Sequence, residues 1–337
     1  MREEQQSGVS AMPGQADRDA SLPTEIAAFF DQITAMPRPV WAVVDGARYG
    51  DLSLQLEQAG LSGRSLFLEH ADEQVERMGG WLVPVQQRED LESLYGLARG
   101  IDSMVFWSCP SGEEALYRHL RSINMVLIPD DEPAPESEAA EGAADEADSA
   151  DGTQAPASPA LREQSVMFRH YDPSVLASFL PLLNAGQFAR LLGPATYLMM
   201  FAPDYGGARS VPRPDNLPIS PRGPLRFSEQ QMQELEQVRV DASQMKIVQF
   251  LRRNDSQHTA KMNDHELMRF VANADSKGRA LGLRSERALG YWAWLLLGSN
   301  GAFAEQPFTR EYLQGYPEDG SPDDKIYKLM ENLAQAK

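Results

Sequence analysis

One stretch of the chain, residues 203–227, is rich in proline and glycine and separates two halves with different hydrophobic patterns. Proline fixes φ and lacks a backbone donor, while glycine is conformationally permissive, so a run of both disfavours long helices and central strands. Before this stretch, short apolar runs alternate with helical periodicities, and after it only helical periodicities occur. We therefore predict two structural units joined by a Pro/Gly linker over 203–227.

The first half contains compact apolar runs that we predict to be strands. These runs are 40–44, 81–85, 103–108, 125–128, 165–169 and 195–202. Helical spacing of apolar residues fills most of the intervals between them. Strands that alternate with helices predict an α/β domain over 21–202, with a mixed sheet and flanking helices. Residues 1–20 are polar and aperiodic, and we predict that they are disordered.

Several helix starts in this half are marked by side chains that can accept from free backbone N–H groups. Asp51 is an expected cap, and so is Asp172, which Pro173 follows at the first helical position. Ser111 and Glu114 have the spacing of a capping box.

An acidic segment interrupts the α/β half between two predicted strands. Between Asp130 and Ala160 there are ten Asp and Glu residues and no Lys or Arg. Without these ten acids the net charge of the chain changes from −18 to −8, so the folded parts are only mildly acidic. We predict a disordered insertion over about 130–162 at the tip of a hairpin, because long surface loops are tolerated thermodynamically.

The second half, residues 228–337, predicts an all-α domain. Ser228 and Gln231 form an expected capping box at its start. Apolar residues then recur at spacings of three and four, as they do over 267–274, 288–295 and 326–333.

Motifs for cofactor or metal chemistry are missing from the sequence. The dipeptide Gly-Lys of the P-loop never occurs, and neither a dinucleotide-binding Gly-x-Gly-x-x-Gly nor a Gly-x-Ser-x-Gly nucleophile elbow is present. His265 and Glu266 open a zincin-like pattern, but Arg269 stands where its second histidine is required. Cys109 is the sole cysteine, so no internal disulfide can form and a cysteine-based zinc site is disfavoured. A small buried role for Cys109 is favoured over a reactive thiol, because the sequence identifies no basic partner for it. We expect no cofactor and no enzymatic activity.

One polar cluster nevertheless admits a catalytic alternative. His170 beside Asp172 has the residue types of a general base and its orienting carboxylate, and Asp45 with Arg48 follows a strand end. Together they would suit a hydrolase or transferase. The favoured interpretation is structural, because helix capping already explains Asp172 and no activated nucleophile accompanies it.

Candidate partner-binding residues fall into three groups. A strand-end turn, a basic helix and the helical domain supply Asp45, Arg48, Tyr49, Arg118, Arg121, Arg252, Arg253, Trp292 and Trp294. For the turn, a purely structural role is equally favoured; for Arg118 and Arg121, with His119 between them, a solvated helix face is favoured. For Arg252 and Arg253 an ordinary charged surface is at least as well supported. Burial of both tryptophans in the helical core is the favoured alternative to a role as anchors.

Several segments, taken in order, resemble the adaptor chaperones of bacterial type VI secretion that share an N-terminal domain of formerly unknown function. The matching segments are Trp41–Tyr49, Ser65–Phe67, Cys109–Arg121, and Phe168–Pro173 with its Leu-rich sequel through Pro194. The resemblance covers about residues 40–202. The chain departs from the family pattern in its long acidic insertion, and the helical domain matches far less clearly.

The resemblance implies a non-catalytic adaptor that binds a toxic effector protein and helps to mount it on a valine–glycine-repeat (VgrG-type) spike. From the residues themselves, the acidic net charge argues against a nucleic-acid partner, and the longest apolar runs are too short to cross a bilayer. The single cysteine fits a reducing cytoplasm. We hypothesise that the helical domain selects the partner. An immunity protein that neutralises a toxin is a further alternative.

Overall fold

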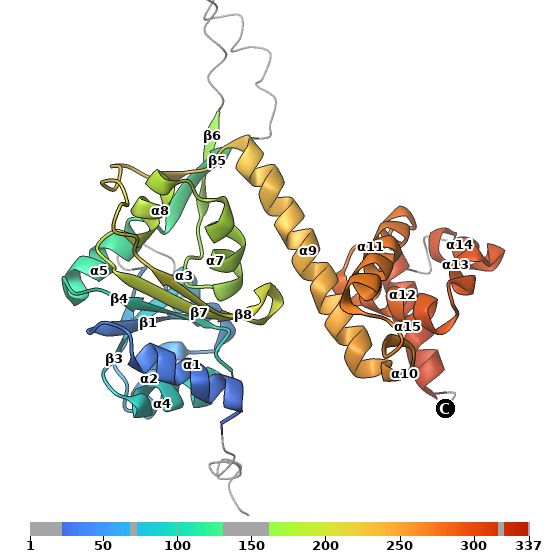
Figure 1. The fold of residues 1–337 in the computed structure, drawn as a ribbon, viewed down its shortest axis with the longest axis horizontal. Coiled ribbons are helices and arrows are strands. Elements are labelled where there is room, and N and C mark those ends of the chain that lie inside the picture. Colours follow the sequence, from blue (N-terminus) through green and yellow to red (C-terminus); the bar gives the residue numbers. More distant parts are fainter. Residues whose placement is uncertain (1–21, 68–72, 99, 131–161, 316–319, 336–337) are drawn as a thin grey trace, which may run out of the picture.

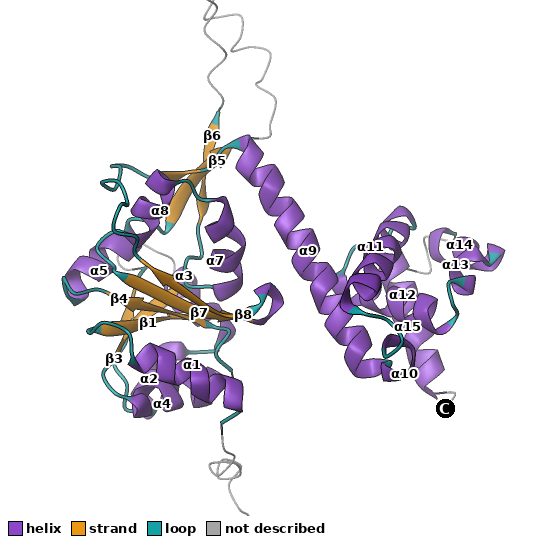
Figure 2. Ribbon diagram, in the orientation of Figure 1, coloured by secondary structure: helices purple, strands orange, loops and turns teal. Residues whose placement is uncertain are grey.

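The computed structural model describes residues 22–67, 73–98, 100–130, 162–315 and 320–335. Residues 1–20, predicted to be disordered, and almost all of the predicted insertion over 130–162 lie outside these ranges. The described chain forms an α/β unit followed by an all-helical unit (Figure 1). Figure 2 shows that every strand belongs to the first unit. The predicted fold class is confirmed.

A six-stranded sheet, antiparallel in every pairing, forms the centre of the α/β unit. Its strands in spatial order are β2 (Arg64–Ser65), β3 (Gly80–Val85), β1 (Val40–Asp45), β4 (Met104–Ser108), β7 (Tyr197–Ala202) and β8 (Gly207–Pro212). Every residue of β1 and β4 is buried. This burial explains why these strands appear in the sequence as continuous apolar runs.

Both faces of this sheet are covered, because successive side chains of a strand point to opposite faces. Trp41 and Val43 pack into one core, whereas Ala42 and Val44 pack into the other. One face is covered by α1 (Thr24–Thr34), α2 (Leu52–Gln58) and α4 (Arg88–Ala98), and the opposite face by α5 (Glu113–Arg121), α7 (Pro173–Phe179) and α8 (Ala185–Leu192) (Figure 1). The remaining short helices of this unit are η1 (Gly46–Arg48), α3 (Glu73–Met78), η2 (Leu180–Leu182) and η3 (Pro203–Tyr205).

A second, three-stranded sheet carries the expected hairpin. β5 (Met125–Pro129) pairs antiparallel with β6 (Glu163–Met167) and parallel with β9 (Leu225–Arg226). The pairing of β5 with β6 confirms that the strands flanking the acidic segment are partners. At the end of this hairpin the backbone N–H of Asp130 donates to the carbonyl of Arg162 at 2.9 Å.

The stretch 203–227, which we expected to be a linker, is part of the α/β unit. It contains β8 and β9, and both Leu225 and Phe227 are buried in the core. Proline is compatible with this structure because β8 is an edge strand and Pro212 is its last residue, where a missing donor costs little. The composition was therefore a misleading guide to this segment.

A single long helix, α9 (Glu229–Asn254), connects the two units. Leu235, near its start, packs into the α/β core, whereas Val248 and Leu251 pack into the helical core. Nζ of Lys246 contacts Asp204 of the α/β unit at 3.1 Å and Glu286 of the helical unit at 3.2 Å. The boundary between the units thus lies inside a helix.

The helical unit packs around Trp292, whose indole Nε1 donates to the carbonyl of Ala274 at 3.0 Å. Its further helices are α10 (Ser256–Thr259), α11 (Asp264–Ala280), α12 (Glu286–Gly298), α13 (Ala302–Glu305), α14 (Pro307–Gln314) and α15 (Pro322–Gln335). Ser228 and Gln231 form the predicted capping box at the start of α9, with each side chain accepting from the backbone N–H of the other residue.

The predicted helix caps are right in two cases and wrong in one within the α/β unit. Asp51 accepts from the backbone N–H of Leu54, and Asp172 accepts from the N–H groups that open α7. The box predicted from Ser111 and Glu114 does not form. Gly112 occupies the N-cap of α5 with φ +90°, and the Glu114 carboxylate contacts arginine side chains instead.

Candidate functional site

Asp45 ends β1 at the edge of the α/β core, and its side chain is completely buried. One carboxylate oxygen accepts from the backbone N–H of Ala47 at 3.2 Å. The turn after it is fixed by close backbone contact, because a Cβ at Gly46 would lie 2.2 Å from the carbonyl oxygen of Arg77. Glycine is therefore required here, and it holds Asp45 in a defined position.

Two arginines flank this buried carboxylate. Arg169, from the connection between β6 and α7, donates to Asp45 and lies 3.8 Å from Asp172. Arg48 lies 3.8 Å from Asp45 and 3.5 Å from Asp102. The side chains of Arg48 and Arg169 remain 43% and 39% exposed. The cluster therefore presents cationic edges to solvent above a buried anion.

Burial dominates the electrostatics of this cluster. It raises the pKa of the Asp45 carboxyl above its ordinary value, and the Arg169 guanidinium opposes that rise. Burial also raises the pKa of the Tyr171 hydroxyl to about 12, and it raises the pKa of Tyr49, whose hydroxyl pairs with Ser103 at 3.1 Å. The Asp45 carboxylate lies between the guanidinium groups of Arg48 and Arg169 and orients both of them. Oriented in this way, the two arginines are suited to binding an acidic group of another molecule.

His170 and Asp172 do not form the base-and-orienter pair that the catalytic alternative requires. The imidazole of His170 is fully buried, and its Nε2 donates to Oδ1 of Asn124 at 2.9 Å. Burial lowers the pKa of His170 to about 3. Asp172 accepts from the backbone N–H of Ser174 at 2.9 Å, as a helix cap does. The two residues therefore have separate structural contacts.

The basic helix α5 presents a second cationic surface. Arg118 is 78% exposed and contacts Glu114 at 2.6 Å. Arg121 and Arg64 both lie over the ring of Tyr117, at 5.5 and 3.3 Å from its centroid. Arg64, on β2, was not a candidate from sequence, because only the fold places it beside α5.

His119 lies between Arg118 and Arg121 in the sequence of α5, but its side chain points inward, toward α8. Its Nε2 donates to the carbonyl of Leu191 at 2.8 Å, and burial lowers its pKa to about 4. A nearby buried thiol, Cys109, has its Sγ 3.7 Å from the carbonyl oxygen of Pro194, and burial raises the pKa of that thiol. His119, on α5, and Cys109, just before it, therefore both contact the C-terminal end of α8 and the residues that follow it.

The two candidate arginines of α9 differ in their contacts. Arg252 donates to the carbonyls of Thr259 and Met262 at 2.6 and 3.0 Å and contacts Asp264, so it fixes the turn between α9 and α11. Arg253 is exposed and contacts the side chain of Gln249.

The two tryptophans of α12 both contribute to the helical core. Trp292 is completely buried, whereas Trp294 is half-buried and packs against the same cluster. None of these helical-unit residues adjoins the cluster around Asp45.

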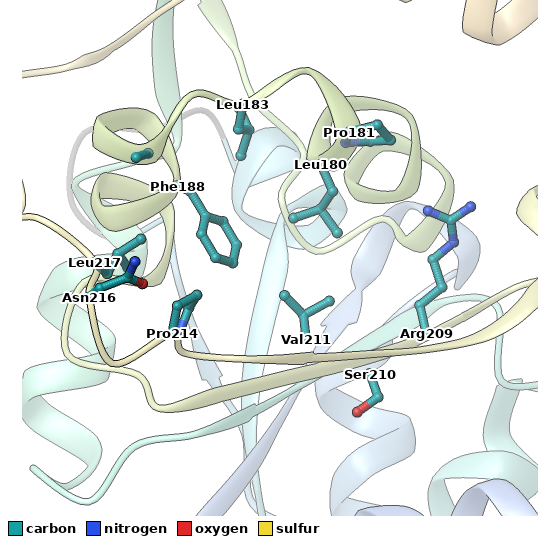
Figure 3. A pocket seen from close by; sticks show the side chains of 11 residues that line it. Leu180, Pro181, Leu183, Phe188, Arg209, Ser210, Val211, Pro214, Asn216 and Leu217 are labelled. Carbon is teal, nitrogen blue, oxygen red and sulfur yellow. The ribbon is translucent and has the colours of Figure 1, made fainter.

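An apolar groove of about 680 Å³, which sequence reasoning missed, lies between β8 and the segments η2 and α8 (Figure 3). Half-buried Leu180, Leu183, Phe188, Val211 and Leu217 contribute to its walls. Part of the groove comes from 203–227, the segment that we expected to be a linker. The alternation of prolines with single apolar residues in this segment gives no sign in the sequence that they form a wall.

Within the described ranges, no three His, Cys, Asp or Glu side chains come together as a metal ion would require. None of the helices in the same ranges combines the length and apolar character needed to cross a bilayer.

Comparison with known proteins identifies one domain. Residues 40–134 match the family described as a domain of unknown function, DUF4123. This range runs from β1 through β5 and includes Asp45, Arg48, Tyr49, Arg118 and Arg121. Searches of curated proteins and of solved structures find no match.

Proposed function

We propose that this chain is a non-catalytic adaptor that binds a toxin effector of bacterial type VI secretion and helps to load it onto a VgrG-type spike. The observation that carries the proposal is the DUF4123 match over 40–134. The matched range contains Trp41–Tyr49, Ser65–Phe67 and Cys109–Arg121, three of the four segments on which the resemblance to the adaptor chaperones rests.

The geometry of the polar residues supports a binding role. The buried polar groups of the α/β unit that suggested chemistry are each engaged in fixing the fold: Asp45 by Arg169, His170 by Asn124, and Asp172 by the start of α7. The accessible parts are the cationic edges of Arg48, Arg169 and Arg118 and the apolar groove. Such surfaces suit protein recognition in the cytoplasm, where effector and spike are assembled.

A secretion assay tests the proposal. Cells that lack this chain are expected to stop delivering one toxin while they continue to assemble and fire the secretion apparatus. The lost toxin should co-purify with the intact chain and with the spike protein. Self-poisoning of the deletion strain would instead identify an immunity protein, and unchanged delivery of every toxin would refute the adaptor.

A conservative pair of variants tests the catalytic alternative. Asp172→Asn keeps a side chain that caps helices well but removes the carboxylate, whereas Asp172→Ala removes the cap as well. The adaptor predicts near-normal delivery for D172N and a loss for D172A that follows its loss of stability. If the D172N protein folds and binds its partner but no longer supports toxin delivery, the result would favour the catalytic alternative.

A further inference from the structure

The open edge of the central sheet is β8. In the described part of the chain β8 pairs only with β7, and no other strand lies beyond it. The backbone N–H of Arg213 donates to the carbonyl of Thr196. This bond shows which residues of β8 direct their backbone N–H groups toward β7 and which direct them away. Because ladder groups alternate along an antiparallel strand, the N–H groups of Ala208 and Ser210 point away from β7, toward solvent.

This edge carries few of the devices that usually protect edge strands. Arg209 is its single charged residue, and residues 207–211 contain neither lysine nor proline and keep a regular register opposite β7. Proline occurs only at the last position of the strand, Pro212. Unpaired backbone donors and acceptors on such an edge form a template for another strand.

The apolar groove lies along the same strand. Figure 3 shows Val211 rising from β8 toward Leu180 and Phe188 and Arg209 rising on the same side toward Pro181, with Ser210 on the opposite side of the strand. An extended chain paired with β8 projects every second side chain to one face of the sheet. Those side chains would enter the groove.

The two ends of the groove differ in charge. Of the described residues that line it, Arg209 alone is charged, and its guanidinium is oriented by the carbonyl of Tyr205, which accepts from Nε at 3.0 Å. At the other end, Pro214 and Leu217 form an apolar wall. The groove therefore matches a strand with apolar side chains at alternate positions and an acidic side chain at the Arg209 end.

We propose that β8 and this groove bind an extended segment of the partner protein by strand addition, with alternating apolar side chains in the groove and a carboxylate on Arg209. This inference rests on the proposed adaptor function in taking the effector as the source of the segment. The binding chemistry itself is independent of that source.

The direct test selects twelve-residue peptides from a random phage-displayed library on the full chain and measures binding of the best enriched peptide, made synthetically. Enriched sequences are expected to alternate apolar and other residues and to carry Asp or Glu near one end. Ser210→Pro, which removes an outward N–H, should weaken binding about tenfold, the effect of losing about 1.4 kcal/mol. Ser210→Ala removes the same contact with the Tyr197 hydroxyl but keeps the N–H, and its affinity should stay within about twofold of the parent chain.

A second pair of variants tests the groove without touching the β8 backbone. Leu217→Asp places a charge in the apolar wall and should weaken peptide binding at least tenfold. Ile219→Asp makes the same change at a side chain that is 96% exposed and does not line the groove, so binding should be unchanged. Peptides that bind equally well to S210P and L217D would overturn the proposal.

Three outcomes separate this inference from others. If the chain sediments as a dimer that S210P dissociates, a second copy covers β8 and the proposal is wrong. If deletion of the chain stops toxin delivery but S210P and L217D restore it fully, the adaptor stands and this surface is wrong. If the peptides bind as predicted but deletion leaves delivery intact, the surface stands and the adaptor function fails.

Discussion

Gly193 and the imidazole of His119 are in direct contact, and a Cβ at position 193 would lie 2.2 Å from Cε1 of that ring. Gly193 ends α8 with φ +53° and ψ −120°, a conformation that side-chain-bearing residues avoid. The same imidazole donates through Nε2 to the carbonyl of Leu191, two residues before Gly193. The end of α8 is thus seated on the inner face of α5.

Gly193→Ala is expected to destabilise the chain by about 2–4 kcal/mol, because the methyl group adds a clash to an unfavourable backbone conformation. Chemical denaturation measures the change. Gly206→Ala is the control: Gly206 also has positive φ, but nothing lies within 4 Å of its Cβ position. That control should cost only about 1–2 kcal/mol. Equal losses in the two variants would show that contact with His119 is unimportant.

Stability should fall on acidification below neutral pH. The folded chain holds the pKa of His119 at about 4 and that of His170 at about 3, both below the ordinary value of 6.5. Between pH 6.5 and 4 the unfolded chain therefore binds protons that the folded chain does not. Each histidine should lower the free energy of unfolding by roughly 1 kcal/mol per pH unit across that window, and its full contribution is present above pH 6.5.

His119→Gln tests this pH dependence, since a glutamine amide can still donate to the Leu191 carbonyl but does not titrate. Urea denaturation between pH 7.5 and 4.5 should give a shallower dependence than in the parent chain. His265→Gln, a change at an exposed histidine of α11, controls for the loss of an imidazole. An H119Q slope equal to that of the parent would contradict the assignment.

Deletion of residues 131–160 should leave the melting temperature nearly unchanged. The backbone hydrogen bond between Asp130 and Arg162 already brings the ends of this segment together, so a short glycine-containing turn can replace it. Calorimetry of the shortened chain measures the effect. A drop of more than a few degrees would mean that the segment contributes packing to the folded protein.

Charge reversal at the two adjacent arginines of α9 should have different effects. Arg252→Glu breaks charge-assisted hydrogen bonds to two carbonyls and should destabilise the helical unit by about 1–3 kcal/mol. Arg253→Glu changes an exposed side chain and should alter stability by less than about 0.5 kcal/mol. R253E is therefore the informative variant for partner capture, which should weaken in a low-salt pull-down if this surface selects the effector. Unchanged capture would exclude Arg253 from that role.

The sequence predicts the fold best where burial dictates composition. β1 and β4 are buried along their whole length, and their apolar runs are unmistakable. β8 escaped prediction because an edge strand alternates small, polar and half-buried residues and adjoins prolines. The capping box predicted from Ser111 and Glu114 does not form for a different reason. Gly112, with positive φ, takes the N-cap position, and the sequence pattern does not reveal this backbone conformation.

The candidate site was only partly predictable, because its contacts join distant parts of the chain. Asp45 and Arg48 stand out as a strand-end turn, but their partner Arg169 lies 124 residues after Asp45. Arg252 appears in the sequence as an ordinary surface cation. Its acceptors are backbone carbonyls of the following turn, which residue types do not reveal.

Helix α9 has a mechanical consequence. Its 26 residues form a rod of about 39 Å whose two ends belong to different cores, with Lys246 pinned to acidic side chains on both sides of the junction. In the proposed adaptor function, a partner bound to one unit would therefore be held at a fixed distance from a partner bound to the other.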